Sequence, residues 1–120
     1  MAVDADRLIT AWIDLELALS HLNSTFATEN VEASHWLRVA WVNAKAGIDE
    51  STNPALQRVV EDLYLESTAL DRTVFSQTKE GYTISQVAGI VIDHRGPTVE
   101  VIKRAMSDLK REIGVIQRAK

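Results

Sequence analysis

Residues 97–118 read PTVEVIKRAMSDLKREIGVIQR, and their apolar positions recur at alternating spacings of three and four. The apolar positions are Val99, Ile102, Met106, Leu109, Ile113 and Ile116. This heptad spacing predicts an amphipathic helix about 33 Å long, which we expect to be the central packing element of the fold. Basic residues recur on another side of the same helix, at Lys103, Arg104, Lys110, Arg111 and Arg118. Glu100, Asp108 and Glu112 dilute that basic charge.

Four further helical segments precede this stretch, and each carries local start or stop signals. Asp4 is a suitable N-cap, Asn53 precedes Pro54, and Gly81 is placed to end a helix. Thr83 and Gln86 have the spacing of a capping box. We therefore expect one all-α domain over residues 1–120, a compact bundle of about five helices. Their approximate ranges are 4–24, 30–48, 53–79, 83–94 and 97–118.

The segment 83–94 is compatible with two local structures. Its capping box favours a short buried helix, whereas the run Ile90, Val91 and Ile92 would also suit a strand. A lone strand would need a second subunit to pair with, so a helix is expected here.

Composition restricts the functional classes. The chain has no cysteine, so disulfides, thiolate metal sites and a cysteine nucleophile are excluded. It has no apolar run of about 18 residues, and aspartates precede its first apolar residues. We expect a cytoplasmic protein without a membrane span.

The charge is unevenly distributed. Residues 1–92 hold thirteen acidic and six basic side chains, a net charge of −7, whereas residues 93–120 hold four acidic and seven basic ones, a net charge of +3. The two parts either neutralise each other within the fold or attract an acidic ligand or a second copy of the chain.

Motifs for catalysis are absent from the sequence. Glu32 and His35 form a single E-x-x-H, whereas a di-iron bundle needs two such motifs and two more glutamates. His94 follows Asp93, and a position near a helix end is the simpler interpretation of this pair. No nucleophile elbow, P-loop or dinucleotide fingerprint occurs. We expect a protein that is not an enzyme and that uses no metal or cofactor.

Trp41 lies off the apolar stripe of the second helix, on a side shared with Arg38 and Lys45. Three arrangements are compatible with this position. The aliphatic stems of Arg38 and Lys45 cover the indole, or Trp41 is an exposed anchor of a protein interface, or Trp41 belongs to the core. We assign Trp41, Arg38 and Lys45 as candidate partner-binding residues, with Leu65 as a weaker one. Apolar flanks beside the stripes of the first two helices also predict a homodimer.

Residues 82–118 contain T-I-S-Q-V-A, then P-T-V before a basic helix, then G-V-I-Q-R. With these motifs the stretch resembles the helix-turn-helix of winged-helix regulators, although the turn GIVIDHRG is longer than usual. It implies DNA binding through residues 83–118. The phosphate contacts would be Arg95, Lys103, Arg104, Lys110 and Arg111.

The functional hypothesis from the sequence is a small regulatory protein that binds and occludes a protein partner. An inhibitor, an anti-activator, an adaptor or an immunity-type factor would fit this description. The alternative is a helix-turn-helix-like DNA-binding regulator.

Overall fold

The computed structural model describes residues 3–48 and 53–118, and within these ranges the chain forms five helices and no strand. The helices are α1 (Ala5–Leu22), α2 (Ala27–Ile48), α3 (Pro54–Lys79), α4 (Ile84–Asp93) and α5 (Arg95–Arg118). This confirms the all-α bundle, and segment 83–94 is helical. Over the same ranges, none of the helices combines the length and hydropathy needed to cross a membrane.

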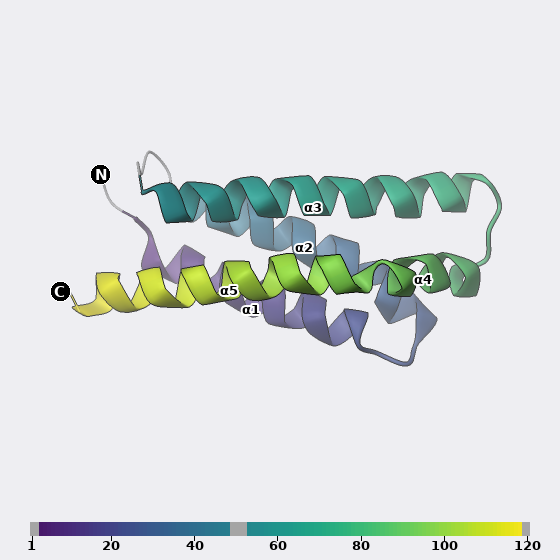
Figure 1. The fold of residues 1–120 in the computed structure, drawn as a ribbon, viewed down its shortest axis with the longest axis horizontal. Helices are drawn as coiled ribbons and strands as arrows, with labels where there is room; N and C mark the ends of the chain where they lie inside the picture. Colours follow the sequence, from purple (N-terminus) through teal and green to yellow (C-terminus); the bar gives the residue numbers. More distant parts are fainter. Residues whose placement is uncertain (1–2, 49–52, 119–120) are drawn as a thin grey trace.

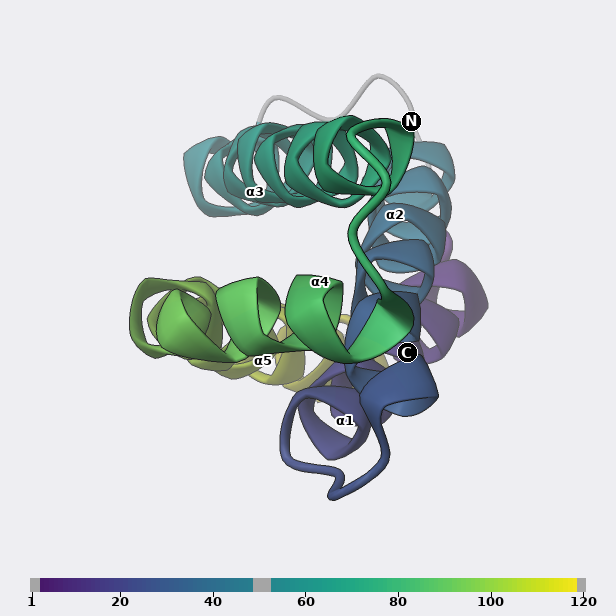
Figure 2. The same ribbon diagram turned by 90° about the vertical axis from the view of Figure 1, so that its right-hand side faces the viewer.

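The five helices form a bundle of four antiparallel members. α1, α2 and α3 alternate in direction along an axis of 51 Å, and α4 followed by α5 returns along α3 as the fourth member (Figure 1). Viewed end-on, neighbouring members pack in the order α3, α2, α1, α5 and back to α3 (Figure 2). α4 packs on α2 and α3. The heptad stripes are typical of this near-antiparallel packing.

α1 and α2 approach each other closely because small residues line their contact. Buried alanines on both helices remove side-chain bulk from this interface: Ala11, Ala18, Ala33, Ala40 and Ala44. At one end Gly47 lies against Leu8, and its carbonyl accepts a hydrogen bond of 2.8 Å from the amide of Asp4. Asp4 also caps α1, as its position in the sequence predicts.

The start of α2 differs from the expected position. The helix begins at Ala27, whereas the sequence predicts a start near residue 30. Asn30 is instead a buried residue of the first turn, and its amide donates to the carbonyls of His21 and Ser24 at 2.8 and 3.0 Å. Asparagine is typical of caps because it bonds to nearby backbone, and here it bonds to the end of the preceding helix and the connecting loop.

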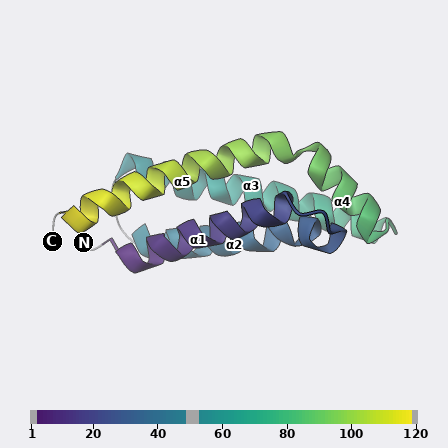
Figure 3. The ribbon, with the colours of Figure 1, turned by 90° about the horizontal axis from the view of Figure 1, so that it is seen from below.

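The fourth member of the bundle is broken between α4 and α5. α4 ends at Asp93, His94 caps it, and α5 begins at Arg95, two residues before the expected start. Pro97 therefore lies inside the first turn of α5, where its missing N–H costs no intrahelical hydrogen bond. The two helix axes diverge at this break (Figure 3).

Candidate functional site

Trp41 is half-buried on the side of α2 that faces α3. Its ring lies 5.2 Å from the ring of Tyr64, measured between centroids, with the planes tilted by 49°. The ammonium nitrogen of Lys45 lies 5.1 Å from the centroid of Trp41. Both contacts are within the usual range for aromatic pairs and cation–π contacts. Lys45 thus covers part of the indole, one of the three arrangements that the sequence left open.

Arg38 has a different role from Lys45. Its guanidinium forms an ion pair of 3.0 Å with Asp71 on α3 and also approaches the imidazole of His35 at 3.4 Å. Arg38 therefore links α2 to α3 at a partly exposed position, where such a pair contributes about 0–1 kcal/mol. It does not cover Trp41 in this arrangement.

Two hollows flank the Trp41 ring. One has a volume of about 450 Å³ and is lined by Trp41, Val42, Lys45 and Ala46. The other has about 430 Å³ and is lined by Trp41, Lys45, Val60, Glu61 and Tyr64. Val42 and Tyr64 are 49% and 47% exposed, which is high for large apolar side chains. We call Trp41, Val42, Lys45, Val60 and Tyr64 the Trp41 surface.

Leu65 lies outside the Trp41 surface. It is 58% exposed, and one residue along a helix turns the side chain by about 100° from Tyr64. Leu65 therefore lies on the outer side of α3, away from α2. The sequence pattern did not single out Val42 or Tyr64, because the meeting of Tyr64 with Trp41 depends on how α3 is placed along α2.

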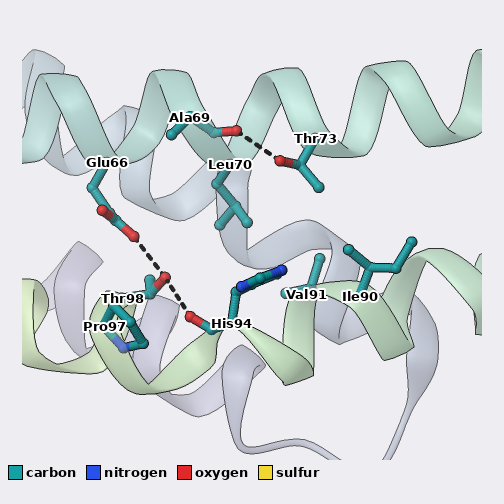
Figure 4. Close-up of a pocket in the computed structure, with 9 residues that line it drawn as sticks. All are labelled: Glu66, Ala69, Leu70, Thr73, Ile90, Val91, His94, Pro97 and Thr98. Atoms are coloured by element: carbon teal, nitrogen blue, oxygen red, sulfur yellow. Dashed lines mark hydrogen bonds between the residues drawn. The ribbon is translucent and has the colours of Figure 1, made fainter.

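A second candidate site is the cleft between α3 and the break that separates α4 from α5 (Figure 4). Its volume is about 250 Å³. The Thr98 hydroxyl donates a hydrogen bond of 2.6 Å to the Glu66 carboxylate, which joins α5 to α3 at one end of the cleft. The imidazole of His94 extends toward α3 (Figure 4). His94 is thus the cap of α4, as its position near a helix end indicated, and it also lines this cleft.

The basic residues of α5 form an exposed strip along its outer side. Its members are Lys103, Arg104, Lys110, Arg111 and Arg118. Two of the acidic residues that dilute the charge of this helix in the sequence turn toward α3. Asp108 is buried between Arg58 at 3.7 Å and Arg111 at 2.9 Å, and Glu112 accepts a hydrogen bond of 3.1 Å from Asn53. Arg95, the remaining predicted phosphate contact, is exposed at the first position of α5.

The histidines are not arranged around a common centre. Glu32 lies 3.8 Å from His21 of α1, and the ring of His35 packs on the edge of Trp36. Across residues 3–48 and 53–118 there is no group of three carboxylate or imidazole side chains positioned to share a metal ion.

The chain was compared with protein-family models, with curated proteins and with solved structures. None of the three comparisons finds a match.

Proposed function

We propose that this chain is a small regulatory protein that binds a protein partner through the Trp41 surface and covers part of that partner. The observation that carries the proposal is the half-exposed pair of Trp41 and Tyr64 with Lys45 beside it, flanked by two hollows. Tryptophan and tyrosine are enriched among the residues that contribute most to protein–protein binding. An inhibitor, an anti-activator, an adaptor or an immunity-type factor would use such a surface, and a cytoplasmic location is part of the proposal.

Occlusion would require no chemistry from the chain. Tyr64 and Lys45 already hold the Trp41 ring in one orientation, so little side-chain freedom remains to be lost on binding. The hollows on either side would accept apolar side chains of the partner, and Val42 would be buried with them. The helices supply a rigid platform, which favours affinity through preorganisation.

A binding experiment with matched variants tests the proposal. A partner isolated with the wild-type chain is purified, and its affinity is measured by calorimetry for wild type, Val42→Glu, Tyr64→Ala and Leu65→Ala. We expect the first two variants to weaken binding by about 30-fold or more, the loss expected at a binding hot spot. Leu65 lies on the outer side of α3, so Leu65→Ala should change the affinity by less than about threefold. Equal affinities for all four proteins would exclude the Trp41 surface.

Self-association is a further part of the proposal. Apolar residues on the outer sides of α1 and α2 remain partly or largely exposed, among them Ile13, Leu17 and Val39. Burial of this face against a second copy would remove it from water. Sedimentation analysis at high protein concentration tests this, and a sole species at 13.3 kDa would contradict it.

The second candidate function is DNA binding through the basic strip of α5. The specific observation in its favour is that Asp108 and Glu112 lie on the α3 side of α5, where both pair with Arg111, so that Glu100 is the exposed acidic residue among the other cations of the strip. α5 is packed against both α1 and α3, so its outer side is suited to phosphate contacts rather than to full insertion into a major groove.

Fluorescence anisotropy with labelled duplex DNA separates this candidate from the first. If the strip binds phosphates, affinity should fall steeply between about 50 and about 200 mM salt. The double variant K103E/R104E should remove binding, whereas Arg72→Glu on the outer side of α3 should retain most of it. Affinity that does not respond to salt would eliminate the nucleic-acid function.

A further inference from the structure

We propose that the cleft between α3 and the α4–α5 break binds a small organic cation, an ammonium group carried on a short apolar body. The cleft is lined by Glu66, Ala69, Leu70, Thr73, Ile90, Val91, His94, Pro97 and Thr98. This site is separate from the Trp41 surface and from the basic strip, and it does not depend on either proposed function.

The break in the fourth member of the bundle creates the space. α4 diverges from the axis of α5 at His94, so the two helices line different parts of the same opening against α3 (Figure 3, Figure 4). The cleft of about 250 Å³ has room for about eight water-sized groups at about 30 Å³ each. A ligand of that size resembles a single small ring with one polar substituent.

The charge of the cleft favours a cation. Glu66 is half-buried, and the hydroxyl of Thr98, itself only 4% exposed, holds one of its carboxylate oxygens at 2.6 Å. The residues that line the cleft include no lysine or arginine, and the ion pairs found among the described residues do not involve Glu66. A negative charge beside apolar groups interacts more strongly with a bound cation than it would in open water.

The remaining lining offers acceptors and apolar surface to such a ligand. The hydroxyl of Thr73 donates its proton to the carbonyl of Ala69 at 3.0 Å, so its oxygen is left to accept a hydrogen bond (Figure 4). An ammonium group would donate to Glu66, and its apolar body would contact Leu70 and Ile90. A ligand carrying a carboxylate would instead be repelled by Glu66.

The test uses three probes of the same shape and different charge. Benzylamine at neutral pH, benzyl alcohol and benzoate are titrated into the ¹⁵N-labelled full chain, and backbone amide shifts are followed by NMR. A fragment of this size binds at about the millimolar level. We expect shifts at the cleft residues for benzylamine, with an affinity about tenfold higher than that of benzyl alcohol and no shifts with benzoate.

Variants then assign the selectivity to Glu66. Glu66→Gln still accepts the hydrogen bond of Thr98 but lacks the charge, so the tenfold preference for the amine should disappear. Glu61→Gln removes an exposed carboxylate of α3 outside the cleft, so this variant should retain the tenfold preference for the amine. Ile90→Trp should fill the opening and abolish binding of both probes. The proposal would be overturned by equal affinities for amine and alcohol, by an unchanged preference in Glu66→Gln, or by shifts that map outside the cleft.

Discussion

Asn43 of α2 donates a hydrogen bond of 2.7 Å to the carboxylate of Asp14 in α1, across the most closely packed pair of helices. Arg7 donates in turn to the side-chain oxygen of Asn43 at 3.1 Å. Asp14 is buried, and this burial raises its pKa above the ordinary value of 3.8. The Asn43 hydrogen bond and the nearby His35 oppose the rise without cancelling it.

The raised pKa predicts that Asp14 makes the fold less stable as pH rises. The folded chain holds this proton more tightly than the unfolded chain, so the contribution is full below pH 3.8 and is lost as pH rises through the folded pKa. Asp14→Asn removes this dependence and can keep the bond to Asn43. Urea unfolding between about pH 4 and pH 7 should show the free energy of unfolding of Asp14→Asn rising relative to wild type. Glu16→Gln, at an exposed position of α1, should follow wild type, and parallel curves for Asp14→Asn would contradict the prediction.

Gly47→Ala should destabilise the protein. A Cβ at this position would lie 2.9 Å from a methyl carbon of Leu8 and 3.0 Å from the Cβ of Arg7. Overpacking of this kind costs about 1–3 kcal/mol, more than the gain in helix propensity of about 1 kcal/mol. Gly89→Ala is the matched control, because nothing lies within 4 Å of its Cβ, and it should stabilise by about 0.5–1 kcal/mol. Chemical denaturation measures both, and a stabilising Gly47→Ala would show that α1 and α2 are less closely packed there.

Asn30→Ala should destabilise the protein at the connection between α1 and α2. It removes the two hydrogen bonds to the carbonyls of His21 and Ser24 from a buried position, at a cost of about 1–3 kcal/mol. Asn23→Ala alters an exposed side chain of the same connection and should change stability by less than about 0.5 kcal/mol. Thermal unfolding of the two variants distinguishes them. Similar melting temperatures would mean that Asn30 does not hold the loop.

Trp41 and Tyr64 should be energetically coupled. A double-mutant cycle with Trp41→Ala and Tyr64→Ala should give an interaction energy of about 0.5–1.5 kcal/mol in unfolding measurements, because the two rings are in contact. The same cycle with Leu65→Ala in place of Tyr64→Ala should give about zero, since Leu65 lies on the outer side of α3. Coupling to Leu65 of the same size would contradict the observed geometry.

Local signals predicted the positions of the helices well, because capping and turn interactions involve residues only one or two helical turns apart. The caps at Asp4 and Asn53 and the capping box of Thr83 with Gln86 are all confirmed. Gly81 has a φ of 90°, which favours glycine over other residues and ends α3 where expected. The starts of α2 and α5 lie two or three residues before the expected positions, and these two differences share one cause. Asn30 and Pro97 are common at helix ends, and here the adjoining chain places each of them inside a first turn.

The candidate surfaces could not be predicted to the same degree. A hydrophobic pattern shows which side of a helix is buried but not which residue of another helix lies opposite. Trp41 was singled out from its own helix, whereas Tyr64, which completes the surface, follows from the alignment of α2 with α3. Likewise Glu66 and Thr98, 32 positions apart, meet only because α5 returns along α3.

α5 shows in one helix what the sequence determined and what the tertiary structure decided. Its heptad stripe, readable from residues 97–118, determined that the chain would pack a long helix into an all-α bundle, because burial of an apolar stripe depends on spacing alone. Only the tertiary structure decided which of its charged residues form ion pairs between helices and which face outward. The rotation of α5 against α3 places Asp108 beside Arg58 and leaves the basic residues outward, because an ion pair between helices depends on where the second helix lies.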